Sequence, residues 1–169
     1  MKANKSGLDP VGLVGLGLMG RGIAACLLAR GLRVVAHDRV SSRARQAVGH
    51  IDATLREMID RRLLAKAQAR DWQQRFQTVT SIGGLAASPF VIESVKEDIA
   101  VKRQVYDELE EALGAQAVIA SNTSSLPITQ LQAGRRHPSR FIGMHWGEPA
   151  QIMRYLEVTP GRSRLPVQP

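Results

Sequence analysis

The sequence predicts an α/β protein with a doubly wound, mostly parallel sheet, because short apolar segments of strand type alternate with segments of helical periodicity. The first unit shows this most clearly. An apolar run at residues 11–15 precedes a helical pattern at 18–30, and a β-branched apolar run follows at 32–36. Gly31 stands where a helix usually ends in a left-handed residue. This order describes a βαβ unit, whose two strands run parallel.

The later segments continue the alternation up to a tail. Residues 41–75 carry apolar side chains at helical spacing without a strand signal, and we interpret them as two helices with a break near residues 62–66. Further elements are expected in this order: strands at 78–81 and 90–95, a helix at 98–113, a strand at 117–120, a helix at 128–133, and strands at 141–145 and 155–158. Three prolines fall within residues 160–169, so this tail is expected to be irregular.

The composition limits the kind of protein. A chain of 169 residues is long enough for one domain with its own core and too short for two full-sized domains. The formal net charge of +8 suits anionic partners. The chain has 2 Trp, 2 Tyr and 3 Phe and no interleaved basic and aromatic pattern for stacking bases, so a nucleic acid partner is not expected.

The single cysteine and the apolar runs bear on the compartment. Cys26 on its own excludes an intramolecular disulfide framework and a cysteine-built metal site, and it fits a reducing compartment. The N-terminus carries no secretory apolar core, and no apolar run reaches the length of a membrane span. We therefore expect a cytoplasmic enzyme without a metal centre or a membrane partner.

A glycine pattern between the first strand and the first helix indicates a phosphate cradle. Residues 15–20 read Gly-Leu-Gly-Leu-Met-Gly. Gly15 permits the tight turn, Gly17 lets the backbone approach a pyrophosphate, and Gly20 lets helix and strand pack closely. Leu18 and Met19 open the helix, whose N-terminus attracts negative charge. The alternative is a glycine-rich turn of an ordinary parallel sheet, which the flanking βαβ order disfavours.

An acidic residue at the end of the second strand indicates which dinucleotide binds. Asp38 follows the last glycine by about 20 residues, where a carboxylate accepts hydrogen bonds from the ribose hydroxyls of NAD and repels the 2′-phosphate of NADP. The adjacent Arg39 softens this preference, because a guanidinium can accept a 2′-phosphate. The pattern predicts NAD as the cofactor.

Three later segments resemble one dehydrogenase family. Residues 91–98 read Val-Ile-Glu-Ser-Val-Lys-Glu-Asp, residues 120–126 read Ala-Ser-Asn-Thr-Ser-Ser-Leu, and residues 140–145 read Arg-Phe-Ile-Gly-Met-His. In this order and spacing they resemble the NAD-binding domain of the L-3-hydroxyacyl-coenzyme A (CoA) dehydrogenases, over about residues 11–161.

This resemblance implies a fold and a reaction. The fold is a Rossmann-type NAD-binding domain over residues 1–159, with residues 41–75 as a projecting helical arm and 160–169 as the irregular tail. The reaction is NAD-dependent oxidation of the 3-hydroxyl of an L-3-hydroxyacyl-CoA to the 3-ketoacyl-CoA. The expected substrate is therefore an acyl-CoA of fatty acid or related metabolism.

The resemblance also implies catalytic residues. His145, which ends the third segment, matches the family's general base, and an imidazole titrates near neutrality. Glu157, in the next expected strand, matches the glutamate that orients this histidine. Ser124 matches a serine that contacts substrate and cofactor. From the residues alone, the alternatives are a strand-end histidine, a surface carboxylate and a helix N-cap serine beside Ser125.

Further binding residues follow from the same resemblance. It assigns cofactor contacts to Glu97 and Lys102. It assigns substrate contacts to Thr54 and Arg61, which fall nearest the family's CoA-contacting positions on the helical arm. For Thr54 and Arg61, a solvated basic helix face is an equally good interpretation.

Two features depart from the family pattern. Glu148 stands where the family commonly has an asparagine on the cofactor side of the site, so the substrate identity stays open. The family also adds a helical C-terminal domain that completes the acyl cleft and dimerises, and this chain stops before it. We therefore expect a truncated chain, whose partner is a helical domain or, in a homodimer, a second copy.

Two other functions remain open from the sequence. The first is a noncatalytic NAD-binding module, or a fragment that needs a helical partner domain. The second is a dehydrogenase of the 3-hydroxyisobutyrate type, because residues 15–20 also resemble the start of that family. Neither acyl-chain length nor oligomeric state can be inferred from the sequence.

Overall fold

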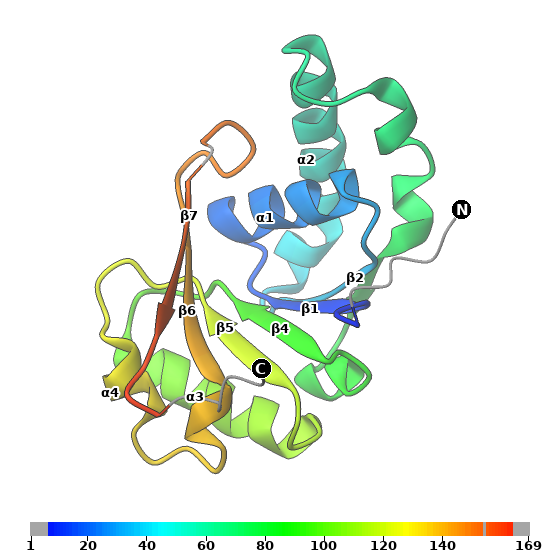
Figure 1. Cartoon of the computed structure of the whole chain (residues 1–169). Helices are drawn as coiled ribbons and strands as arrows, with labels where there is room; N and C mark the ends of the chain where they lie inside the picture. Colours follow the sequence, from blue (N-terminus) through cyan, green and yellow to red (C-terminus); the bar gives the residue numbers. More distant parts are fainter. Residues whose placement is uncertain (1–6, 154, 164–169) are drawn as a thin grey trace.

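The computed structural model describes residues 7–153 and 155–163. They form a seven-stranded sheet in the order β3-β2-β1-β4-β5-β6-β7, with helices on both faces (Figure 1). The strands are β1 (Val11–Val14), β2 (Val34–His37), β3 (Phe76–Val79), β4 (Phe90–Glu93), β5 (Val118–Ser121), β6 (Phe141–Trp146) and β7 (Leu156–Pro160). The pairings from β3 through β6 are parallel, and β7 pairs antiparallel with β6.

The helices lie in two groups. The α-helices are α1 (Leu18–Ala29), α2 (Ser41–Asp60), α3 (Ile99–Ala112) and α4 (Ile128–Gln132). Short 3₁₀ turns are η1 (Lys66–Ala69), η2 (Trp72–Arg75), η3 (Ile82–Leu85) and η4 (Pro138–Arg140). In Figure 1, α1 and α2 lie on one face of the sheet, and α3 and α4 lie on the other. No helix in the described ranges is long and apolar enough to cross a membrane.

The sheet separates two apolar cores, because neighbouring residues of a strand point to opposite faces. In β4, Val91 packs into the core beneath α3, and Ile92 packs into the core beneath α1. In β1, Leu13 and Val14 divide between the two cores in the same way. The central strands are covered on both faces, which explains why they are apolar runs without polar alternation.

The predicted fold class is confirmed. Strand and helix alternate as the sequence indicates, with ends that differ by a few residues from the expected ones. Val11 of β1 is in parallel register with Val34 of β2, so the first βαβ unit is present. Gly31 closes α1 with a φ of +81°, the left-handed conformation expected of it.

The second helix predicted within residues 41–75 is wrong. α2 is one helix that ends at Asp60, and two 3₁₀ turns follow it. Arg62 and Asp71 take left-handed φ angles of 57° and 55°, which cannot continue an α-helix. Trp72 is 4% exposed and joins the core beside α1, so tertiary packing anchors this stretch. α2 and these turns still rise away from the sheet as a projecting arm (Figure 1).

Candidate active site

A cleft of about 660 Å³ opens at the carboxyl ends of β1, β2, β4 and β5. The strand order reverses between β1 and β4, and open α/β sheets bind ligands at such a switch point. Seven of the residues predicted to be functional line it: Gly15, Gly17, Leu18, Met19, Asp38, Glu97 and Ser124. The topology therefore brings the glycine turn, the acidic strand end and the serine turn to one cleft.

The three glycines of the first turn serve different purposes. Gly15 has a φ of +96°, and a Cβ there would overlap the Ser94 carbonyl. A Cβ at Gly20 would overlap the carbonyl of Gly15. The fold therefore needs these two glycines. A Cβ at Gly17 would meet nothing within 4 Å, so the protein's own packing does not require glycine at this position.

The N-terminus of α1 is open toward a ligand. Gly17 is its N-cap and has no side chain to satisfy the first amides. The first turn of α1 also contains no acidic residue. Free amides and a helix dipole at a glycine turn fit the pyrophosphate of a dinucleotide.

Asp38 lies at the end of β2 and is 9% exposed. Its Oδ2 accepts a hydrogen bond of 2.8 Å from the Leu16 amide, and its Oδ1 accepts one of 2.8 Å from the Val40 amide. The carboxylate therefore fixes the glycine turn and also reaches the cleft wall. Arg39 and Arg43 line the cleft beside it, which makes this end of the cleft basic.

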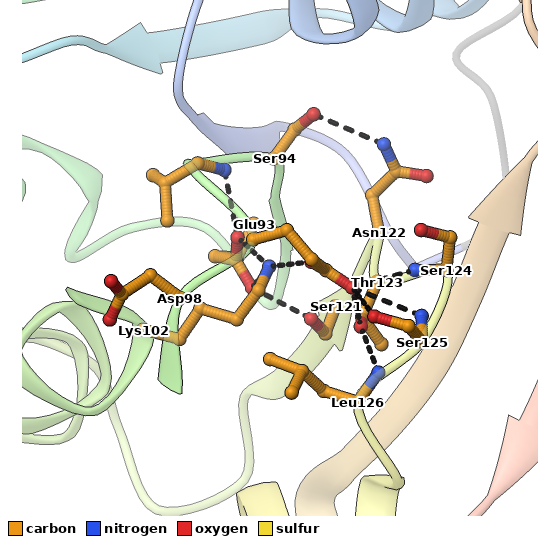
Figure 2. Close-up of polar contacts among 12 residues, drawn as sticks. Glu93, Ser94, Asp98, Lys102, Ser121, Asn122, Thr123, Ser124, Ser125 and Leu126 are labelled. Atoms are coloured by element: carbon orange, nitrogen blue, oxygen red, sulfur yellow. Dashed lines mark hydrogen bonds and ion pairs between the residues drawn. The ribbon is translucent and has the colours of Figure 1, made fainter. Parts of the chain in front are cut away.

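Glu97 holds the turn that carries Ser124 (Figure 2). Its Oε1 accepts hydrogen bonds from the Thr123 hydroxyl, from the amides of Ser124 and Ser125 at 3.0 and 3.1 Å, and from the Ser125 hydroxyl at 3.1 Å. Burial by itself would raise the pKa of Glu97, but these hydrogen bonds and the charge of Lys102 lower it to about 2. Glu97 is therefore an anion at neutral pH.

A buried polar cluster lies behind Glu97. The ammonium of Lys102 lies 2.7 and 3.0 Å from the two carboxylate oxygens of Glu93, and both side chains are 0% exposed. The hydroxyls of Tyr106 and Ser121 donate to Glu93 Oε2 at 2.6 and 2.7 Å. Burial, followed by the charge of Glu93, raises the pKa of Tyr106 far above its ordinary value, so its phenol remains a donor.

The burial of Lys102 corrects one expectation. The resemblance assigned Lys102 a cofactor contact, but its side chain has no exposed surface, and Lys102 does not line the cleft. Burying an ammonium is costly unless anions pair with it. Lys102 forms ion pairs with two carboxylates, those of Glu93 and Glu97. This geometry offers no direct route from Lys102 to a cofactor.

His145 and Glu157 face each other across β6 and β7. They are antiparallel register partners, with 3.8 Å between His145 Nδ1 and Glu157 Oε2. The Tyr155 hydroxyl donates to the same Glu157 oxygen at 3.1 Å, and its ring packs edge-on against the imidazole with centroids 6.1 Å apart. The His145 side chain is 33% exposed and that of Glu157 is 52% exposed. The pair is adjacent, but it is open to water.

Asn122 joins the serine turn to the strand of His145, a role that the sequence did not reveal. Its Nδ2 donates to the Ser94 hydroxyl at 3.1 Å, and its Oδ1 accepts from the Trp146 amide at 3.0 Å. The side chain thus connects the carboxyl ends of β4, β5 and β6. An asparagine directly after a buried strand was the available signal, since such a side chain needs partners there.

The two residues predicted to contact CoA lie outside the cleft. The Thr54 hydroxyl donates to the His50 carbonyl one turn earlier, and Arg61 pairs with Glu57 at 2.9 Å. Neither Thr54 nor Arg61 lines the cleft. Glu148 is exposed in the loop after β6. Ser124 does not cap a helix, because α4 begins at Ile128 with Pro127 as its N-cap.

Comparison with known proteins decides the family. The model of the family described as "3-hydroxyacyl-CoA dehydrogenase, NAD binding domain" matches residues 10–164. The chain belongs to this family. The resemblance inferred from the three sequence segments is therefore confirmed, and NAD is the cofactor for this domain.

Individual relatives agree with this assignment. The 5-formyl-3-hydroxy-2-methylpyridine 4-carboxylate 5-dehydrogenase of Mesorhizobium japonicum is 36% identical over 157 residues, covering 92% of this chain and 50% of the relative. The 3-hydroxybutyryl-CoA dehydrogenase of Bradyrhizobium diazoefficiens is 32% identical over 154 residues, covering 91% and 53%. A crystal structure of 3-hydroxybutyryl-CoA dehydrogenase from Escherichia coli K12 matches with a TM-score of 0.87 at 32% identity, covering 94% of this chain and 34% of that one.

The chain spans about half, or less, of the length of these relatives. The match lies in the NAD-binding domain of the family. Family membership therefore gives the fold and the cofactor, and the relatives named above are dehydrogenases.

Proposed function

We propose that this chain is the nucleotide-binding part of an enzyme that oxidises the 3-hydroxyl of L-3-hydroxyacyl-CoA to the 3-ketoacyl-CoA with NAD. The observation that carries the proposal is the pairing of His145 with Glu157 across β6 and β7. Asn122 ties this strand to the turn of Ser124, which lines the cofactor cleft. His145, Glu157 and Ser124 would thus supply a base, a carboxylate partner and a hydroxyl from neighbouring strand ends, with Ser124 on the cleft wall.

In the proposed reaction, His145 acts as the general base. Its Nδ1 faces Glu157, so Nε2 is free to take the proton of the substrate hydroxyl. Glu157 then stabilises the imidazolium that forms, as the acid of a catalytic triad does. The Ser124 hydroxyl is placed to donate a hydrogen bond to the reacting oxygen or to the thioester carbonyl. NAD, when bound, accepts the hydride from the carbon that carries the hydroxyl.

Different cleft residues are proposed to bind different parts of the cofactor. The amides at Gly17, Leu18 and Met19 are proposed to hold the pyrophosphate at the start of α1. Asp38 accepts from the ribose hydroxyls, and its negative charge disfavours a 2′-phosphate. Glu97, which lines the cleft next to the Ser124 turn, would contact the cofactor from that side. These assignments keep the predicted cofactor residues, with Lys102 moved from a direct contact to a supporting one.

The acyl-CoA side of the site is proposed to need a partner. Tyr155, Leu156 and Val158 of the β7 segment are 50%, 44% and 58% exposed, and Met153 before them is 49% exposed. Exposed apolar side chains on the strand that carries Glu157 suit coverage by another protein surface. We propose a helical domain as that partner, as in the relatives that extend beyond this part, and a second copy of the chain as the alternative.

Two alternatives compete with this function. A noncatalytic NAD-binding module would bind NADH and remain inactive even with a helical partner domain. An enzyme of the 3-hydroxyisobutyrate type would not respond to acyl-CoA, and the family match favours the 3-hydroxyacyl-CoA type instead.

The test is a titration of NADH fluorescence with the chain, with and without acetoacetyl-CoA. We expect NADH to bind and acetoacetyl-CoA to change its fluorescence or affinity. In a second step, a helical C-terminal domain from a relative is added in trans, and oxidation of 3-hydroxybutyryl-CoA is measured. Turnover that disappears in His145→Ala supports the mechanism, and unchanged turnover removes His145 from it. NADH binding without turnover in the complemented protein favours the noncatalytic module.

A further inference from the structure

The buried cluster behind the Ser124 turn is more than an isolated ion pair. The ammonium of Lys102 makes three contacts: two with Glu93, at 2.7 and 3.0 Å, and one with Glu97 Oε2 at 3.3 Å. The two contacts with Glu93 are hydrogen bonds, and the contact with Glu97 is an ion pair. Lys102 therefore links a fully buried carboxylate to one that lines the cleft.

The Glu93 end of this link is rigid. Besides Lys102, the Glu93 carboxylate accepts hydrogen bonds from the Val95 amide at 2.8 Å and from the hydroxyls of Tyr106 and Ser121. These donors come from β5, from α3 and from the segment after β4. A carboxylate satisfied on every side in a buried site has one position, and this fixes the ammonium that it binds.

The two carboxylate oxygens of Glu97 have different partners, one in the core and one in the serine turn. Oε2 faces Lys102, whereas Oε1 accepts the hydrogen bonds from residues 123–125. Among those donors are the backbone amides of Ser124 and Ser125. Ser124 contributes its amide to Glu97, and this exposed residue lines the cleft. The contacts thus run without a gap from buried Glu93 to the backbone of Ser124.

We propose that Lys102 is a positioning residue: anchored by Glu93, it orients Glu97 so that this carboxylate holds the Ser124 turn and leaves the Ser124 hydroxyl facing the cleft. The inference depends on the proposed function in one respect, namely that the Ser124 hydroxyl binds the substrate. The competing interpretation is that Lys102 serves Glu93 alone and that its contact with Glu97 has no effect on the turn.

The main test uses a pair of substitutions that keeps the core neutral. Lys102→Met by itself would leave Glu93 as an unpaired buried charge, so the informative variant is Glu93→Gln/Lys102→Met in the same chain. Arg103→Met is the matched control, because it removes one positive charge from the next, exposed position of α3. Circular dichroism verifies that each variant is folded.

Two NMR readouts then separate the interpretations. The first is the pKa of Glu97, followed through its side-chain carboxyl carbon. With Lys102 removed we expect its acid dissociation constant to fall about tenfold or more. The second is the amide resonances of Ser124 and Ser125, which we expect to shift as their hydrogen bonds to Glu97 lengthen. Unchanged Glu97 titration and unchanged amide shifts in the folded double variant would overturn the proposal.

A second variant covers the case in which the double variant does not fold. Glu97→Gln leaves the buried Glu93–Lys102 pair intact, and the Lys102 ammonium resonance is compared with that of the wild-type chain. We expect a clear shift of the ammonium resonance, because the Glu97 side chain near the ammonium loses its negative charge. An unchanged ammonium resonance would show that Lys102 and Glu97 are not coupled. Failure of the proposed function would instead appear as absence of NADH binding to the wild-type chain, which these resonances do not depend on.

Discussion

The two strand ends that carry the candidate chemistry are built in different ways. At the end of β4 and β5, Glu93 and Lys102 are fully buried, and Glu97 collects its hydrogen bonds within one turn. At the end of β6 and β7, His145 and Glu157 are 3.8 Å apart and substantially exposed. Charges in a dry, satisfied cluster hold each other in place, whereas exposed charges are screened by water. The β4–β5 end is therefore preorganised, and the β6–β7 end is open to water.

The exposed His145–Glu157 pair is the part of the proposed site that a partner covering β7 would affect most. Covering the β7 segment would exclude water from His145 and strengthen its interaction with Glu157. The Tyr155 hydroxyl, which now donates to the same Glu157 oxygen, would then compete with the histidine for it. The predictions below test the contrast between the two ends, beginning with the largest effect.

Lys102→Met as a single substitution should destabilise the chain most. It leaves the Glu93 carboxylate buried without a cation, which costs about 3–5 kcal/mol. The free energy of unfolding in urea measures this loss, with Arg103→Met as a control expected to change it by less than about 0.5 kcal/mol. A loss below about 1 kcal/mol would contradict the picture of a preorganised, buried cluster.

Gly17→Ala should weaken NADH binding at least about tenfold, or about 1.4 kcal/mol, because its methyl group would enter the space proposed for the pyrophosphate. The free energy of unfolding should stay within about 1 kcal/mol of the wild-type value, since the new Cβ meets no protein atom. Gly20→Ala is the contrasting variant, because its Cβ overlaps the Gly15 carbonyl and lowers stability as well. Equal NADH affinity of Gly17→Ala and wild type would argue against this placement of the cofactor.

The stability contributed by Glu97 should depend on pH. Its folded-state pKa of about 2 lies below its ordinary value of 4.5: burial opposes the shift, and the hydrogen bonds of the serine turn and Lys102 outweigh it. A lowered pKa stabilises the folded state above the ordinary value, and this stabilisation is lost as the pH falls from about 4.5 toward 2. Because 33% of the side chain is exposed, we expect about 1 kcal/mol.

Urea unfolding at pH 6 and pH 3 measures this contribution. Glu97→Gln should reduce the difference in unfolding free energy between these two conditions by about 0.5 kcal/mol, because roughly half of the contribution is still present at pH 3. Asp98→Asn tests a neighbouring acid that caps α3 instead of holding the serine turn. The same pH dependence in wild type and Glu97→Gln would mean that Glu97 does not hold the turn.

Glu157→Gln should have the smallest effect on stability, below about 0.5 kcal/mol, since the carboxylate is 52% exposed and beyond hydrogen-bond distance of His145. The free energy of unfolding of the isolated chain measures it. If the substitution costs more than about 1 kcal/mol, then the two strand ends are equally preorganised, and the contrast drawn above is wrong.

The sequence revealed the local features with good accuracy. The glycine turn and the acidic residue after β2 were predicted from a short motif and a run of apolar residues, whereas Glu97 and Ser124 were assigned through the family resemblance. The second helix of the arm was predicted wrongly, since helical periodicity does not show that Arg62 and Asp71 take left-handed conformations. Trp72 packs into a core whose other residues come largely from distant segments, and this packing stabilises the backbone conformation here.

The sequence by itself determined the alternating α/β order, the family and the identity of the cofactor turn, because these follow from residue types at fixed spacing. The tertiary structure decided which of the predicted residues face the cleft. It placed Lys102 in the core with Glu93, brought Asn122 between three strands, and left His145 and Glu157 exposed on the β6–β7 pair. Burial and hydrogen-bond partners come from segments far apart in the chain, and so no local pattern contains them.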